Sequence, residues 1–155
     1  MNLRIIAFLL VAPFSLFGAD NKTKTVAALE FRPVVSKDTP GATPHVIKNP
    51  KGDEDVFLGT AVIIDAASVE RAFAIAEGDP IRVSISIRLT ATGQSAFGAY
   101  TQKHIGERIA IVVSGSILSA PIIREPILGD SLQVSGDFTY ERAQEIARGI
   151  KPDSK

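Results

Sequence analysis

Ser131, His104 and His45 are the residues of this chain whose types are suited to nucleophilic or metal chemistry. A serine hydroxyl becomes a nucleophile when a histidine accepts its proton and an acidic group orients that histidine. The chain has two histidines and no cysteine, which excludes thiolate catalysis, disulfides and cysteine-based zinc sites. The residue types therefore leave open one hydrolase hypothesis, with Ser131 as nucleophile and His104 as base.

Ser131 belongs to a tetrapeptide that spells the signature of a family of lipases and esterases, Gly129-Asp130-Ser131-Leu132. That family places the signature near its N-terminus and its base in an Asp-x-x-His motif near its C-terminus. Here the motif comes late in the chain, and no histidine follows it. We therefore interpret Asp130 and Ser131 as turn residues before a strand, and the hydrolase stays an alternative.

A small acidic cluster, Asp53 to Asp55, is the other candidate for chemistry. Calcium-binding loops place their ligands at defined spacings, and that pattern is absent, so a solvated loop explains the cluster. His45 is interpreted as a solvated loop residue. His104 is interpreted as a partly buried residue near a helix C-terminus. Phosphate-binding and dinucleotide fingerprints are also missing, so we expect no catalytic residues, no metal and no cofactor.

The overall charge argues against nucleic acid as a partner. The chain has 17 basic and 17 acidic residues, a formal net charge of zero. Phosphate neutralisation requires a basic surplus, and none exists here. A length of 155 residues suits one domain with a few extra segments.

Residues 1–19 have the layout of a secretory signal peptide. Arg4 is the only charge before Asp20, an apolar run follows it, and small residues come near Ala19. The apolar run is short for a spanning helix, which needs roughly 20 residues. Phe17 lies where small residues are preferred before a cleavage point, so the cleavage site is open, and a retained anchor is the alternative. The sequence predicts a periplasmic or extracellular protein without a further membrane span.

The segment after the signal predicts a strand and then a linker. Residues 26–35 alternate loosely, with Leu29, Phe31 and Pro33 on one parity. Residues 36–55 are rich in proline, glycine and charge, which indicates a loop or linker. We therefore expect an N-terminal strand and linker over residues 20–55, and an α+β domain over 56–151.

Periodicity predicts the elements of that domain. Strands are expected at 56–65, 72–76, 81–89, 108–113, 116–120 and 131–135, with helices over 92–105 and from Thr139 to residue 150. In residues 81–89 apolar and polar side chains alternate, as in a sheet buried on one face. The order predicts an α+β two-layer sandwich of ferredoxin-like type, with a mainly antiparallel sheet and two helices on one face.

An ordered series of short motifs fills most of this domain. In chain order it consists of Leu89, Thr90, Gly93, Phe97, Thr101, residues 105–113, Gly115, residues 118–121, Ile123, residues 125–127, Gly129, residues 135–139 and Ala143. The series resembles the head subdomain of the first periplasmic domain of SecD, the accessory subunit of the bacterial protein-export channel. Residues 29–32 also resemble the strand that precedes the head in that family. Two positions depart from the pattern, Ser114 in place of an aspartate and Asp130 in place of a glycine.

The resemblance implies a fold and a process rather than a reaction. Its motifs are turns, caps and strand ends, so it carries no catalytic residues to this chain. SecD is a membrane protein that works with SecF and uses the proton gradient for protein export. We expect this chain, with no apolar span predicted after the signal, to lack the intramembrane groups for such coupling. The resemblance implies the part of SecD that contacts the emerging polypeptide.

We therefore expect a non-enzymatic binding module that contacts a polypeptide or an envelope protein, translocon subunits included. A self-associating structural subunit is the alternative from another class. Extended peptide added at a sheet edge is the expected mode, because main-chain hydrogen bonds make little demand on sequence. Exposed irregular loops on a rigid scaffold often carry function, and such a loop is expected at 122–131. The candidate contact residues are Arg124, Glu125, Ile127, Leu128 and Asp130.

Overall fold

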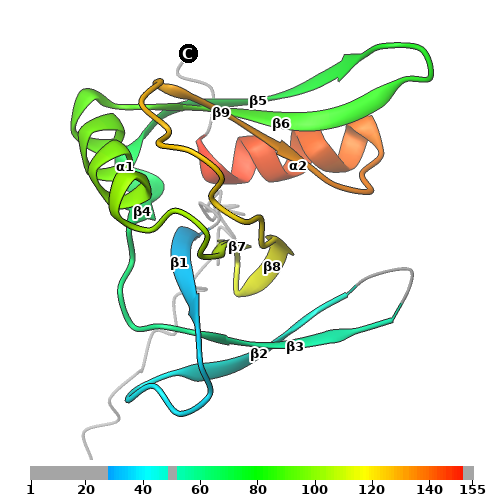
Figure 1. The fold of residues 1–155 in the computed structure, drawn as a ribbon. Coiled ribbons are helices and arrows are strands. Elements are labelled where there is room, and N and C mark those ends of the chain that lie inside the picture. The colour runs from blue at the N-terminus through cyan, green and yellow to red at the C-terminus, as the bar shows by residue number, and fades with distance from the viewer. Residues whose placement is uncertain (1–27, 49–51, 152–155) are drawn as a thin grey trace, which may run out of the picture.

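The computed structural model describes residues 28–48 and 52–151 of the chain. The signal peptide expected at 1–19 lies outside these ranges. Within them the chain forms short strands in two antiparallel sheets, with two α-helices (Figure 1). No helix in the described ranges is both long enough and apolar enough to cross a membrane.

The larger sheet gathers strands from both halves of the chain. Its order is β2-β3-β1-β7-β8, with β4 paired to β1, and every pairing is antiparallel. The strands are β1 (Leu29–Val35), β2 (Thr43–Ile47), β3 (Glu54–Leu58), β4 (Ile64–Asp65), β7 (Ile109–Val113) and β8 (Ser116–Ser119).

The smaller sheet has three strands in the order β5-β6-β9, again antiparallel. These are β5 (Val69–Glu77), β6 (Arg82–Leu89) and β9 (Ser131–Ser135). Helix α2 (Tyr140–Ile150) packs along β5 and β6, and α1 (Ala91–Lys103) lies near β4, β6 and the 3-10 turn η1 (Ala66–Ser68). Figure 1 shows α2 beneath the smaller sheet and the β2–β3 hairpin at the opposite end of the molecule.

Strand β7 explains why the larger sheet has two cores. Ile109, Ile111 and Val113 belong to the main core with α1, α2 and the smaller sheet, whereas Ala110 and Val112 belong to a second core with β2 and β3. A strand buried on both faces is expected to be a continuous apolar run. The central strand predicted at 108–113 is therefore confirmed.

Both predicted helices are present and capped. The Thr139 hydroxyl accepts a hydrogen bond from Arg142 N at 3.2 Å, and the Thr90 hydroxyl accepts one from Gly93 N at 3.1 Å. Such caps satisfy amide groups that have no partner within the helix. The buried residues of α2 form an apolar stripe at helical spacing and are Ala143, Ile146, Ala147 and Ile150.

The α+β sandwich with mainly antiparallel strands and two helices is confirmed. The strands are divided between two sheets rather than gathered in one, and α2 lies on the inner face of the smaller sheet. This division creates the space between the sheets that the candidate site uses.

Two expectations along the N-terminal half were wrong. Part of the expected linker, residues 43–47, forms β2 and pairs with β3, because Val56 and Leu58 on β3 offer it an apolar surface at Ile47. The strand expected over 56–65 is interrupted after Leu58, where Gly59 O accepts hydrogen bonds from the Arg32 side chain and the chain turns.

The polar face predicted for residues 81–89 is only partly exposed. Ser84 and Ser86 are buried, although their side chains lie on the face opposite the core. Ser86 stands between Phe73 on β5 and Gln133 on β9, and those larger side chains shield it. The Gln133 amide also donates to the Ser84 hydroxyl at 2.8 Å, which satisfies that buried group.

Candidate functional site

The irregular segment 122–131 is fastened to α1 and to the start of β7. Ile127 N donates to the Thr101 hydroxyl at 2.9 Å, and the Gln94 side-chain amide donates to Leu128 O at 2.7 Å. Ile123 N donates to Glu107 O at 2.8 Å. Thr101 is fully buried, and its hydroxyl also donates to Phe97 O. The segment is therefore part of the rigid scaffold.

The structure places the five predicted contact residues in different surroundings. Arg124 and Glu125 are exposed. Leu128 is 66% exposed, next to Gly98 of α1. The Asp130 carboxylate lies 3.6 Å from the Arg88 guanidinium. Only Ile127 reaches the apolar hollow described next.

An apolar crevice of about 240 Å³ lies beside β9, between the two sheets. Its floor comes from the main core, and its rim comes from β9 and segment 122–131 together with Pro121. The lining residues are Phe31, Phe97, Ile109, Ile111, Pro121, Ile127, Ser131, Leu132, Gln133 and Val134. Such a lining favours aliphatic or aromatic side chains of a ligand.

Strand β9 has a free edge along this crevice, because its only strand partner in the described residues is β6. Leu89 N donates to Asp130 O at 2.7 Å, which fixes the alternation of hydrogen-bonded pairs along β6 and β9. Leu132 and Val134 therefore bond to β6. The N–H and C=O groups of Ser131, Gln133 and Ser135 point outward. An extended chain can pair with those groups while its side chains enter the crevice.

Most residues that line the crevice were not predicted from the sequence as contact residues. Phe31 lies on β1 and Phe97 on α1, far apart in sequence. Their ring centroids are 5.5 Å apart, because β1 pairs with β4 and α1 contacts β4. The available signal was the alternation of Leu132 and Val134 in a predicted strand. That alternation predicts an inward face, but it does not show that the outer edge is unpaired.

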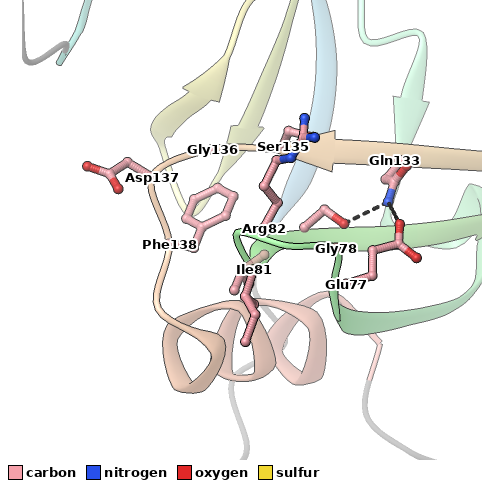
Figure 2. Close-up of a pocket in the computed structure, with 11 residues that line it drawn as sticks. Glu77, Gly78, Ile81, Arg82, Gln133, Ser135, Gly136, Asp137 and Phe138 are labelled. Carbon is pink, nitrogen blue, oxygen red and sulfur yellow. Dashed lines mark hydrogen bonds between the residues drawn. The ribbon is translucent and has the colours of Figure 1, made fainter.

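A second hollow of about 570 Å³ lies at the far end of the smaller sheet, beyond the end of β9 (Figure 2). Figure 2 shows the Gln133 side-chain amide directed at Glu77, and Phe138 next to Gly136. The same amide donates to the Ser84 hydroxyl. The walls of the hollow carry Arg82, Glu77 and Asp137. This hollow is polar and mixed in charge, so the apolar crevice is the better match for polypeptide side chains.

The hydrolase constellation is not assembled by the described hydrogen bonds. His104 Nδ1 lies 2.9 Å from a Glu107 carboxylate oxygen, and the imidazole stacks on Tyr100 with ring centroids 4.0 Å apart. No hydrogen bond among the described residues joins His104 to Ser131. His45, expected in a loop, lies half-buried in β2 opposite Val56.

Two residues of the acidic cluster form ion pairs, and the third, Asp55, is exposed on β3. Glu54 begins β3 and forms a two-pronged ion pair with Arg108, at 2.5 and 3.2 Å, while Asp53 pairs with Lys48. The Arg108 guanidinium hydrogen bonds hold the pKa of Glu54 below its ordinary value. Arg108 also donates to Ala120 O, so this pair ties the β2–β3 hairpin to the ends of β7 and β8.

Comparison with protein families identifies a match over most of the described residues. Residues 44–152 match the family described as SecDF, P1 head subdomain. The match contains β9, α1, segment 122–131 and most of the crevice lining.

Individual relatives agree with this match. The protein translocase subunit SecD of Rhodobacter capsulatus is 32% identical over 128 residues, covering 79% of this chain and 23% of the relative. That of Rickettsia bellii is 43% identical over 70 residues, covering 45% of this chain and 14% of the relative. The chain thus spans about a quarter or less of the length of the curated relatives that it matches.

Solved structures give the same result. A structure of SecDF, described as a membrane component that enhances protein export, superposes with a TM-score of 0.66 at 27% identity, covering 84% of this chain and 64% of that one. A crystal structure of SecDF in a super-membrane-facing form gives a TM-score of 0.66 at 28% identity, covering 84% of this chain and 19% of that one.

Proposed function

Because this chain belongs to the family of the SecDF P1 head subdomain, we propose that it is a periplasmic module of protein export that binds extended polypeptide at the free edge of β9. Relatives with this domain are protein translocase subunits, and one solved relative enhances protein export. We propose translocon subunits as its partners in the envelope, because the related proteins are translocase subunits. Binding at β9 needs no cofactor and no reacting group.

The observation that carries the proposal is the meeting of a free strand edge with an apolar crevice. The outward groups of Ser131, Gln133 and Ser135 supply main-chain hydrogen bonds, and Leu132 and Val134 turn their side chains toward the crevice. An added strand alternates its side chains in the same way. Every second side chain of the ligand therefore enters the crevice, and the rest face solvent.

This mode suits a ligand whose sequence varies. Main-chain hydrogen bonds are common to all polypeptides except at proline, and the crevice asks only for an apolar side chain at alternate positions. The residues of segment 122–131 then act as a rim. Arg124, Glu125 and Leu128 are exposed there, and Asp130 immediately precedes β9.

Point variants on β9 test the proposal better than a deletion in segment 122–131. A deletion that removed Ile127 would leave the buried Thr101 hydroxyl without its donor and disturb the fold. Gln133→Pro removes one outward N–H at the middle of the edge, where proline is tolerated. Gln133→Ala removes the same side chain and keeps that N–H, so it is the matched control.

The ligand is a fluorescein-labelled synthetic peptide of alternating valine and threonine, followed by anisotropy. We expect Gln133→Pro to weaken binding about tenfold, and Gln133→Ala to bind nearly as the unaltered protein does. Equal binding by the unaltered protein and Gln133→Pro would show that β9 does not receive the peptide.

A further inference from the structure

The other edge of the smaller sheet, β5, carries a self-complementary sequence. Its regular part, from Arg71 to Glu77, has alanine at every second position, two apolar residues between the alanines and opposite charges at the ends. The seven residues are Arg71, Ala72, Phe73, Ala74, Ile75, Ala76 and Glu77. Read backwards, the pattern is the same with the charges exchanged.

We propose that this edge is an interface between two copies of the chain, paired antiparallel about a two-fold axis at Ala74. In that register Arg71 faces Glu77 of the second copy at both ends of the strand pair. Phe73 faces Ile75 of the second copy, also twice. A two-fold interface requires a patch that complements itself, and cross-strand pairs of opposite charge and of aromatic with β-branched residues stabilise antiparallel strands.

The backbone of β5 is oriented for this register. Within the described residues β5 pairs only with β6. Because Leu89, Ile87 and Ile85 of β6 form their backbone hydrogen bonds with β9, the residues between them form theirs with β5. Their partners on β5, which therefore bond to β6, are Arg71, Phe73, Ile75 and Glu77. The N–H and C=O groups of Ala72, Ala74 and Ala76 point outward. A two-fold axis at Ala74 pairs these outward residues with each other, as an antiparallel ladder requires.

The edge also lacks the features that protect strands from pairing. Between Val69 and Glu77 there is neither proline nor lysine, and the stretch from Ala72 to Ala76 has no charge. Phe73 is 43% exposed on the face away from α2. In the regular part of the strand the charged residues are Arg71 and Glu77, and each faces the oppositely charged residue of the second copy.

Helix α2 lies where it can extend the same interface. A groove of about 290 Å³ separates the β5 edge from α2, and its helical wall consists of Tyr140, Gln144, Ala147 and Arg148. Since α2 packs under β5 and β6, pairing β5 strands ~4.8 Å apart brings the two α2 helices to ~10 Å, a helix-packing distance. Tyr140 of one copy then approaches Arg148 of the other.

The resulting assembly has one continuous sheet in the order β9-β6-β5-β5-β6-β9. Both β9 edges stay free at its outer ends, so the dimer presents two polypeptide sites facing away from each other. The interface proposal does not depend on peptide binding at β9, and either can fail alone.

Charge exchange provides the test, on protein purified from cells that express the full chain. Arg71→Glu places like charges opposite each other at both ends of the interface, and we expect the dimer dissociation constant to rise about tenfold. The double variant Arg71→Glu/Glu77→Arg restores opposite charges and should restore the dimer. Sedimentation velocity over a concentration series measures both.

A cysteine crosslink gives a second test that does not depend on charge, because the chain has no cysteine of its own. Residues facing each other in a hydrogen-bonded pair have Cα atoms ~5.5 Å apart, within disulfide range. Ala74→Cys should therefore form a disulfide-linked dimer on mild oxidation. Ser131→Cys, on the free edge of β9, should not.

Two outcomes overturn the proposal. One is a chain that stays monomeric at every concentration together with an Ala74→Cys variant that does not crosslink. The other is a dimer that Arg71→Glu leaves unchanged, since this would place the contact elsewhere. Crosslinking of Ala74→Cys to an added cysteine-containing peptide, in place of a second copy, would make β5 a peptide-binding edge and would also overturn it.

Discussion

At the scale of single residues, Thr101 connects the candidate site to the core. It is fully buried in α1, and its hydroxyl donates to Phe97 O at 2.9 Å while accepting from Ile127 N at 2.9 Å. The hydrogen-bonding capacity of the buried hydroxyl is thus satisfied, and so is that of an amide in segment 122–131. From the sequence, Thr101 was expected only as one position of the motif series, because a local motif does not show a donor 26 residues later.

Thr101→Val keeps the shape of the side chain and removes the acceptor for Ile127 N. An amide left without a partner in a largely buried place costs ~1–3 kcal/mol. We expect the free energy of unfolding, measured by urea denaturation, to fall by about that amount. Thr101→Ser, which keeps the hydroxyl, should lose less. If the valine variant were as stable as the serine variant, the hydrogen bond would not hold the segment.

Glu54 makes stability depend on pH. Its pKa is lowered from 4.5 chiefly by hydrogen bonds from Arg108 in the folded state. A carboxyl group with a lowered folded pKa stabilises the fold above its unfolded pKa, and that contribution is lost as pH falls through the folded pKa. Glu54→Gln should therefore be less stable than the unaltered chain near pH 7, with a difference that shrinks below pH 4.5.

Chemical denaturation of both chains across this pH range measures the difference. A gap that stays constant from neutral to acidic pH would show that the Glu54 charge does not contribute through Arg108. Since both side chains are partly exposed, added salt should also narrow the gap at neutral pH.

At the scale of elements, the sequence predicts those that are fixed by local patterns. The apolar run of β7, the stripe of α2 and the alternation of β6 all led to correct elements. The short strand β2 was missed, since it contains Pro44 and is flanked by the prolines, glycines and charged residues of 36–55, which resemble a loop. Only the pairing with β3 makes it a strand. The free edges of β5 and β9 were also beyond prediction, because an edge is defined by which strands are not adjacent.

Gly93 shows how an element is positioned by a close approach. A Cβ added there would lie 2.6 Å from Ser68 O, and that carbonyl also accepts a hydrogen bond from Thr90 N at 2.9 Å. The start of α1 thus rests directly on the 3-10 turn.

Gly93→Ala should destabilise the protein, although alanine favours helices by about 1 kcal/mol over glycine. The methyl group would push α1 away from backbone atoms that cannot yield. Gly98→Ala in the same helix is the control, since its nearest neighbour is the Leu128 side chain at 3.3 Å, which is exposed and can move. Thermal unfolding compares them, and a Gly93→Ala variant as stable as the control would contradict the close contact.

At the scale of the whole molecule, the division into two sheets accounts for both proposals. The crevice exists because β9 belongs to the smaller sheet while Phe31 and Ile111 belong to the larger one. The two edge strands of the smaller sheet differ in the surface that they offer a partner. β9 borders an apolar crevice suited to varied chains, whereas β5 has a pattern that complements itself.

Membership in the SecDF P1 head family was expected from the motif series, and the α+β fold from the order of the predicted strands and helices. The position of the binding site was not. Of the predicted loop 122–131, only Ile127 and Ser131, the first residue of β9, line the crevice. The loop is fastened to α1, and the lining comes mainly from the strands. Loop composition alone does not show where apolar surface is left uncovered.

The most direct test of polypeptide binding at β9 is amide hydrogen exchange of the protein with and without the valine–threonine peptide. We expect slower exchange at Ser131, Gln133 and Ser135 when the peptide is bound, and no slowing with a control peptide whose alternate amides are N-methylated. Unchanged exchange at these three amides, with protection elsewhere or with the methylated peptide equally effective, would contradict binding by strand addition at β9.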